Sequence, residues 1–226
     1  LTPANSIPDP IEFPINTEPD NKLLSPLITV LSPKNLIGNT VVSVSDFRPR
    51  KSKYSNLNIV FNPEFLTEAN YIDDFKNQNR IIIGGPRPHS TRVKNLFEKV
   101  FRDVPIIKTS STIAEMVKYT ANCFLATKVS FANEIKQLCD ATCVDYDKVI
   151  EYATYDDRLG TSHWKVPGPD GHFGFGGSCF PKDVNGLINY SKALDVKMNV
   201  LEATWQTNLT VRPEKDWEEL EGRAVT

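Results

Sequence analysis

The order of hydrophobic and polar positions divides the chain near residue 110. Before it, short apolar runs rich in β-branched residues at Leu57–Phe61 and Ile81–Gly84 are typical of buried strands. Thr40–Phe47 alternates weakly and predicts another strand, as does Val104–Lys108. Ser90–Phe101 carries apolar residues at helical spacing after a capping residue. This order predicts the later half of a parallel α/β unit.

After residue 110 the period becomes helical. Thr112 and Glu115 form a capping-box pattern, and apolar residues then recur at helical spacing through Cys139. The pattern predicts one helix over 112–139, which is long for a globular domain. Because it is apolar or small on more than one face, we expect it to be the buried axis of a helical domain or a dimer interface.

The remaining segments are shorter. Asp145–Thr154 and Asp183–Leu194 predict further helices, and the charged tail Val211–Thr226 has Trp217 as its one large anchor. Residues 1–38 hold seven prolines without a sustained period, so we expect them to be irregular or disordered.

Composition excludes several classes of protein. There are 26 basic and 28 acidic residues, so the basic excess of a nucleic-acid binder is missing. No apolar run is long enough to cross a bilayer, and no signal segment opens the sequence, so we expect no membrane partner and a cytoplasmic location. The four cysteines form no CxxC pair and the three histidines are scattered, so we expect no metal site.

Gly174–Asp183, with the sequence GFGGSCFPKD, is the segment richest in candidate chemistry. Its glycines allow close approach of a ligand, and Cys179 follows them with Lys182 and Asp183 just beyond. A thiol beside a cation in such a loop is a candidate nucleophile. The alternative is a tight turn with a buried cysteine, and Cys123, Cys139 and Cys143 are themselves expected to be small buried residues on a helix.

Lys118 and Asn122 are four residues apart on the long predicted helix and share one face. A cation and an amide on one face can stabilise an oxyanion. A solvated helix face explains the same spacing.

Asn62–Glu68, with the sequence NPEFLTE, follows a predicted strand. Glu64 and Glu68 would share a face if Pro63 began a helix. The alternative is that these acids only compensate the dipole of that helix.

Residues 156–160, with the sequence DDRLG, contain Arg158. A solvated turn with a local ion pair is the simple explanation of this segment.

Taken in order, NPEFLTEAN, EMVKYTANCFLATKVSFANEI, DDRLG and GFGGSCFPKD resemble the signature of the UDP-glucose/GDP-mannose dehydrogenase family. The similarity runs from about Leu57 to Leu194, and CFPKD together with NPEFL is similar to the UDP-glucose branch. The resemblance implies an α/β followed by all-α fold: the remnant of a Rossmann-like parallel sheet, and a helical dimerisation and substrate domain built on the long helix. The expected regions are 1–38 (irregular), 39–109 (part of the NAD-binding domain), 110–206 (helical domain) and 207–226 (tail).

The resemblance also implies a chemistry, the oxidation of C6 of UDP-glucose to UDP-glucuronate with two NAD. It makes Cys179 the nucleophile that forms a thiohemiacetal and then a thioester. Lys118 and Asn122 would stabilise the oxyanion, and Asp183 would organise water and proton transfer. Glu64 would be a general base or would position water for thioester hydrolysis.

Binding roles are implied in the same way. Glu68 would lie near the nicotinamide ribose, and Ser45 would stand where the family has a threonine. Arg158 would reach the substrate of a neighbouring subunit, which implies a homodimer through the helix 112–139. The residues that would contact UDP-glucose are Phe65 and Leu66, and, through backbone amides, Phe173, Gly174, Phe175, Gly176 and Gly177.

The sequence departs from the family at the cofactor site. The G-x-G-x-x-G fingerprint of a dinucleotide-binding domain is absent, so we expect the front half of that domain to be missing. One alternative is therefore a non-catalytic dimeric remnant that at most binds a nucleotide sugar. Another is a cysteine hydrolase that pairs Cys179 with His163 or His172.

Overall fold

The computed structural model describes residues 40–43, 58–67 and 70–219, and the predictions for residues 1–38 lie outside them. The described residues form two compact units, one within residues 20–120 and one within residues 121–226.

The first unit is built on a four-stranded sheet whose strands follow one another in sequence order. The strands are β1 (Thr40–Ser43), β2 (Asn58–Phe61), β3 (Ile81–Gly84) and β4 (Ile106–Thr109). β1 and β2 are parallel, as are β3 and β4, and each pair is in register over four residues.

The expected parallel pairing is found between β1 and β2 and between β3 and β4, whereas β2 and β3 pair antiparallel through Phe61 and Gly84. A parallel connection needs a crossover element that covers the sheet. The helix between these strands, α2 (Tyr71–Lys76), has only six residues and none of them is buried. The chain therefore returns beside β2 in the opposite direction.

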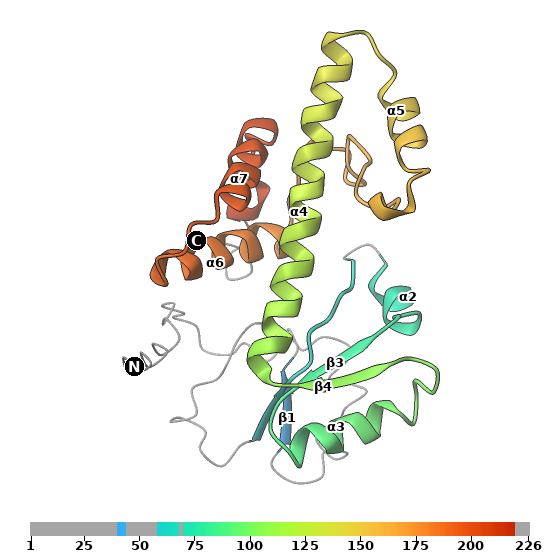
Figure 1. Cartoon of the computed structure of the whole chain (residues 1–226), viewed down its shortest axis with the longest axis vertical. Coiled ribbons are helices and arrows are strands. Elements are labelled where there is room, and N and C mark those ends of the chain that lie inside the picture. Colours follow the sequence, from blue (N-terminus) through green and yellow to red (C-terminus); the bar gives the residue numbers. More distant parts are fainter. Residues whose placement is uncertain (1–39, 44–57, 68–69, 220–226) are drawn as a thin grey trace, which may run out of the picture. The chain divides into compact units, whose positions relative to one another are not determined.

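β3 is buried along its whole length, and its alternate residues face opposite sides of the sheet. α3 (His89–Phe97) covers one side and ends four residues before the predicted limit. The core on that side consists of Val60, Ile81, Ile83, Val93 and Phe97. On the other side Ile82 packs with Phe61 and Ala114, at the start of the long helix (Figure 1).

The long helix is confirmed as α4 (Ser111–Ala141). α4 begins one residue before the predicted capping residue Thr112, and the hydroxyl of Ser110 accepts the hydrogen bond from the Ile113 amide at 3.2 Å. Ser110 precedes the first helical residue and is therefore placed to satisfy an amide of the first turn.

The second unit surrounds the later part of α4. α5 (Tyr146–Ala153) lies beside that part (Figure 1), and Asp145 caps it by accepting from the Lys148 amide. The core between them consists of Ala132, Cys139, Tyr146, Trp164 and Val166.

Three later elements complete this unit. α6 (Cys179–Ala193) begins four residues before the predicted helix, and α7 (Asn199–Val211), which the sequence analysis did not anticipate, packs beside it. The turn η3 (Asp216–Glu219) holds Trp217, which is buried against Trp205 as the predicted anchor.

The prediction for the three helix cysteines is correct for Cys123 and Cys139, which are buried, and wrong for Cys143, which is exposed. Cys143 follows the end of α4 with a φ of 57°, so the turn lifts it out of the helix face. In the described part of the chain, no helix has the length and apolar character needed to cross a membrane.

Candidate active site

Cys179 is the first residue of α6 and is exposed. This excludes the alternative of a buried cysteine in a tight turn. The N-terminus of a helix carries partial positive charge that favours a thiolate. Cys123 is the opposite case, since burial raises the pKa of its thiol to about 12.

Asp183 lies one turn after Cys179 on α6 and is fully buried. Its carboxylate accepts a hydrogen bond from Asn122 Nδ2 at 2.5 Å, and it forms an ion pair with Lys182. A buried carboxylate needs such partners because its desolvation is costly. The structure thus brings Asn122 and Asp183 together at the start of α6.

The glycine-rich loop, residues 173–177, leads directly into this helix. Its backbone amides are held by side chains of the same unit: Gly174 donates to Asn133 Oδ1 at 3.1 Å, and Phe175 to Asn208 Oδ1 at 2.7 Å. Gly177 donates to Asp216 Oδ2 at 3.0 Å. A backbone amide has one hydrogen to donate, so the amides of Gly174, Phe175 and Gly177 are used in hydrogen bonds within the fold. Contacts of the loop with a ligand would have to be made by its other groups.

Sequence reasoning missed the residues that hold this loop. Asn133 and Asn208 lie inside helices, are buried, and show no periodic signature. The one signal in the sequence that could have indicated them is that asparagine, a poor helix former, occurs within an apolar stretch. Arg212 and Asp216 belonged to a segment that was expected to be a tail.

Lys118 and Glu64 lie in the first unit. The Lys118 side chain is 7% exposed, so the solvated-face alternative is wrong for it. Its ammonium group donates to the backbone carbonyl oxygen of Glu64 at 3.4 Å.

The segment that carries Glu64 is not a helix. Residues 62–67 are irregular and helix α2 begins only at Tyr71, so the expected helix starting at Pro63 is wrong. The buried side chain of Asn62 donates to the Ile82 carbonyl at 2.8 Å, which ties the segment to β3. Glu68 and Ser45 lie outside the described residues.

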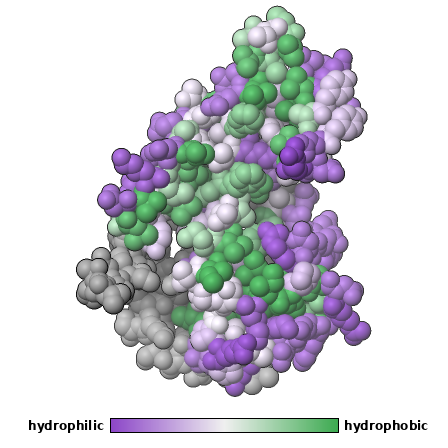
Figure 2. Space-filling view, in the orientation of Figure 1, coloured by the Kyte–Doolittle hydropathy of each residue, from purple (hydrophilic) through white to green (hydrophobic). Residues whose placement is uncertain are grey.

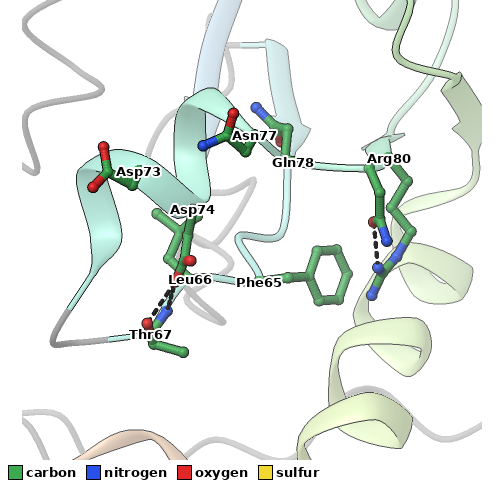
Figure 3. Close-up of a pocket in the computed structure, with 9 residues that line it drawn as sticks. Phe65, Leu66, Thr67, Asp73, Asp74, Asn77, Gln78 and Arg80 are labelled. Atoms are coloured by element: carbon green, nitrogen blue, oxygen red, sulfur yellow. Dashed lines mark hydrogen bonds between the residues drawn. The ribbon is translucent and has the colours of Figure 1, made fainter. Parts of the chain in front are cut away.

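Phe65 and Leu66, the predicted sugar contacts, line a cavity of about 350 Å³ (Figure 3). The guanidinium of Arg80 lies over the Phe65 ring at 4.1 Å from its centroid. Across the cavity, Asp74 accepts from the amide of Thr67 at 2.8 Å and from its hydroxyl at 2.5 Å. This volume is at the lower end of those that hold small ligands.

Arg158 lies in the short turn η2 (Asp157–Leu159). Its guanidinium donates to both carboxylate oxygens of Asp156, with Nε at 2.9 and 3.0 Å, and its side chain is exposed. Lys128 fixes the turn by donating to the carbonyls of Leu159 and Gly160. The turn has the predicted local ion pair, and the role of Arg158 across a subunit boundary stays a prediction.

The two histidines considered for a hydrolase have separate surroundings. His172 Nδ1 contacts Glu214 Oε1 at 3.0 Å. The His163 ring packs against Phe180, and its Nδ1 atom is buried with no hydrogen-bond partner among the described residues. Burial lowers the pKa of His163, with a smaller contribution from Lys128.

Gly84 and Gly85 are the glycines at the end of β3. A dinucleotide pyrophosphate needs a glycine-rich turn open to the ligand. A Cβ atom on Gly84 would lie 2.6 Å from Ala114 Cβ, and one on Gly85 would lie 3.3 Å from Val60, so both glycines serve internal packing. The described residues therefore fit the later half of a dinucleotide-binding sheet without a pyrophosphate cradle. They also contain no cluster of three or more potential metal ligands of the His, Cys, Asp or Glu type.

Two domain families match the chain. The NAD-binding domain of the UDP-glucose/GDP-mannose dehydrogenase family matches residues 33–104, and the central domain of the same family matches residues 112–210. Together these matches cover well over half of the chain.

Individual relatives agree with the domain matches. The chain is 39% identical to a UDP-glucose 6-dehydrogenase of Bacillus subtilis over 158 residues, which are 70% of this chain and 33% of the relative. It is 34% identical to a GDP-mannose 6-dehydrogenase of Pseudomonas savastanoi pv. phaseolicola over 174 residues, which are 76% of this chain and 38% of the relative. The chain therefore spans about a third of the length of these relatives.

A solved structure has the same fold. The UDP-glucose dehydrogenase of the archaeon Pyrobaculum islandicum superimposes with a TM-score of 0.67 and 30% identity, covering 84% of this chain and 45% of that one. With the exposed thiol on the first residue of α6, the Asn122–Asp183 pair and two matching domains, this chain belongs to the UDP-glucose/GDP-mannose dehydrogenase family.

Proposed function

We propose that this chain carries the substrate half of a UDP-glucose 6-dehydrogenase, which oxidises C6 of the sugar from alcohol to carboxylate. The observation that carries the proposal is the exposed Cys179 at the N-terminus of α6, with the buried Asp183–Asn122 pair one turn away. The two hydrides that leave C6, one before and one after thiol addition, pass to NAD.

The proposed role of Cys179 is covalent. Its sulfur forms a bond to the aldehyde carbon and its proton passes to the aldehyde oxygen, which gives a thiohemiacetal. After the second hydride has left, the carbon is held as a thioester. Water then adds to the carbonyl, the carbon–sulfur bond breaks, and sulfur leaves as a thiolate while the product becomes a carboxylate.

The proposed roles of the neighbouring groups follow from their chemistry. Asn122 can donate a hydrogen bond to the oxygen on C6 as negative charge develops there, because Asp183 fixes the orientation of its amide. Lys118 would add a charged donor, and Glu64 would position the hydrolytic water.

UDP-glucose is preferred over GDP-mannose as the substrate because CFPKD and NPEFL are similar to the UDP-glucose branch. Phe65 and Leu66 would contact the sugar from the cavity beneath Arg80.

The homodimer is proposed on the surface of α4. Phe124, Phe131 and Leu138 are spaced seven residues apart on this helix and are 68%, 49% and 61% exposed. Figure 2 shows hydrophobic side chains gathered over the upper part of α4. A second copy that packs on this stripe would bury it, as in a coiled-coil seam.

The test is calorimetric titration of the purified chain with UDP-glucose, with UDP-N-acetylglucosamine and GDP-mannose as controls. Selective binding of UDP-glucose is expected, and a Cys179→Ser variant should retain it because the thiol is proposed to act after binding. Binding of none of the three would contradict a working substrate site in this chain.

A second candidate is a dimer that binds a nucleotide sugar without oxidising it, which is favoured by the absence of the G-x-G-x-x-G motif from the sequence. NADH formation separates the two. The chain is mixed with UDP-glucose and NAD, and the absorbance at 340 nm is followed. An increase whose rate is proportional to the protein concentration would exclude the non-catalytic candidate.

A further inference from the structure

Arg212 is a buried arginine at the end of α7, only 3% exposed. Its Nε donates to Asp216 Oδ1 at 2.7 Å, and its Nη1 donates to Asp170 Oδ2 at 2.8 Å. Nη1 also lies 3.4 Å from the carbonyl oxygen of Phe173, the first residue of the glycine-rich loop. A buried guanidinium between two carboxylates is a charge-assisted network with fixed geometry.

The partners of this arginine hold both ends of the loop. Before the loop, the Asp170 carboxylate accepts the amide of His172 at 3.1 Å. After it, Asp216 Oδ2 accepts the amide of Gly177 at 3.0 Å while its other oxygen binds Arg212. One ion cluster therefore ties residues 170–177 to α7 and η3.

The loop is packed directly on this cluster. A Cβ atom on Gly176 would collide with the Arg212 guanidinium and the Asp216 carboxylate. Gly174 has a φ of 67°, and a Cβ there would collide with Asn208 Oδ1. These two glycines are thus needed by the fold of the loop itself.

The side-chain amides of two asparagines hold the middle of the loop. Asn208 is fully buried and binds both polar backbone groups of Phe175, accepting from its N–H and donating to its carbonyl at 2.9 Å. Asn133, on α4, accepts from Gly174. We call Asn133, Asn208, Arg212, Asp216 and Asp170 the loop clamp.

We propose that the loop clamp is a positioning device that fixes the glycine-rich loop, and through it the first turn of α6 and Cys179. The loop ends at Gly177 and only Ser178 separates it from Cys179, so an error in loop position is passed to the thiol. Catalytic groups must be held within a fraction of an ångström of their productive geometry. The part of this proposal that concerns the nucleotide sugar rests on the proposed function.

The clamp also explains why the chain past α6 matters to the site. Arg212 and Asp216 follow residue 210, where the match to the central domain of the family ends, yet they bind the loop before Cys179. They act through the backbone of residues 173–177 and are positioning residues.

The test uses the whole chain with Arg212→Lys and Asp216→Asn. Lysine keeps the positive charge but loses the planar fork that reaches two carboxylates at once. Asparagine keeps the shape of Asp216 and loses its charge. The matched control is Asp140→Asn, which breaks the exposed Lys136–Asp140 ion pair on α4, away from the loop.

Three measurements are made on each protein: the Kd for UDP-glucose by calorimetry, the melting temperature, and the rates at which iodoacetamide alkylates Cys179 and Cys143 under native conditions. Cys143 is exposed in the same unit and is an internal reference. In both clamp variants we expect UDP-glucose to bind about tenfold more weakly, since a charge-assisted contact that orients the loop is lost. The ratio of the Cys179 rate to the Cys143 rate should fall, because a loosened first turn of α6 stabilises the thiolate less.

Each outcome decides between the proposals. If wild type binds UDP-glucose and the variants match it in Kd and in alkylation ratio, the clamp proposal is overturned and the proposed function stands. If wild type binds no nucleotide sugar, the proposed function fails, and the alkylation ratio alone decides on the clamp. A lower melting temperature with both cysteines accelerated equally would mean a merely structural role and would also overturn it.

Discussion

At the scale of single residues, cysteines in one unit have opposite chemistry because of their surroundings. Cys179 and Cys143 are exposed, whereas Cys123 and Cys139 lie in the interior. Burial, with help from the negative charge of Asp183, raises the pKa of Cys123 to about 12, and the charge of Lys182 offsets only part of this. Position in the fold thus decides which of the four thiols can react.

We therefore expect selective alkylation. At pH 8, a short treatment with iodoacetamide should modify Cys179 and Cys143 and leave Cys123 and Cys139 unmodified, because burial screens both of the latter from the reagent. Cys123 is protected further, since a thiol with a pKa of about 12 has almost no thiolate at that pH. Peptide mass spectrometry measures the modification at each site. Early labelling of Cys123 in the folded chain would contradict the burial described for it.

Asp183 provides a second prediction at this scale. Asp183→Asn removes the charge that binds Lys182 and weakens the hydrogen bond from Asn122. We expect the free energy of unfolding to fall by about 2 kcal/mol, the usual worth of a hydrogen bond to a charged group. Urea denaturation followed by circular dichroism measures it. Asp140→Asn, at an exposed ion pair, should change stability by less than about 0.5 kcal/mol, and equal losses in the two variants would refute the prediction.

At the scale of elements, α4 has one exposed apolar stripe beside its buried faces. Phe131 on this stripe also packs edge-on against Trp164, so one ring joins the surface to the core. Tyr152 and Tyr155, stacked at the end of α5, are exposed as well. This apolar surface is consistent with a partner that covers it.

The dimer proposal leads to a substitution test. Phe124→Glu should convert a dimer of the chain to a monomer, because it places a charge in the stripe that a second copy would bury. Light scattering after size-exclusion chromatography measures the mass. Val200→Glu on α7, at a valine of similar exposure, is the control and should leave the mass unchanged. A wild-type chain that is monomeric at all concentrations would disprove the interface.

At the scale of the whole chain, carboxylates with lowered pKa values link stability to pH. Burial of Asp216 opposes ionisation, but its hydrogen bonds with Arg212 and the Gly177 amide outweigh burial and bring its pKa below its ordinary value of 3.8. The pKa of Asp170 is lowered by Arg212 and His172 against the same effect of burial. A carboxylate with a depressed pKa in the folded state stabilises the fold above its unfolded pKa, and this contribution is lost as the pH falls through the folded value.

The contribution of Asp170 and Asp216 to the free energy of unfolding should therefore be the same at pH 6 and pH 5. It should decrease below about pH 4. Thermal unfolding at pH 6, 4 and 3 measures this. In Arg212→Lys the loss between pH 6 and pH 3 should be smaller, because part of the ion cluster is already absent at pH 6. An identical pH dependence in the two proteins would show that the cluster contributes nothing to acid sensitivity.

Local patterns predicted the strands and the long helix but missed α7. The run Ile81–Gly84 predicts β3, and the helical period predicts α4 to within two residues at either end, because burial of one face leaves a repeat in the sequence. The ordered motifs also indicate the family, which the domain matches confirm.

Only the tertiary structure decided the contacts between distant residues. β2 and β3 pair antiparallel, and the short helix α2 between them has no buried residue and does not cover the sheet. The direction of this pairing leaves no periodic pattern in the sequence. The loop clamp joins Asn133 to Gly174 and Asp216 to Gly177 across about 40 residues of chain, as their separations of 41 and 39 show. Sequence by itself determined which residues carry reactive groups, whereas their partners are set by packing, because a hydrogen bond depends on distance in space and leaves no spacing along the chain.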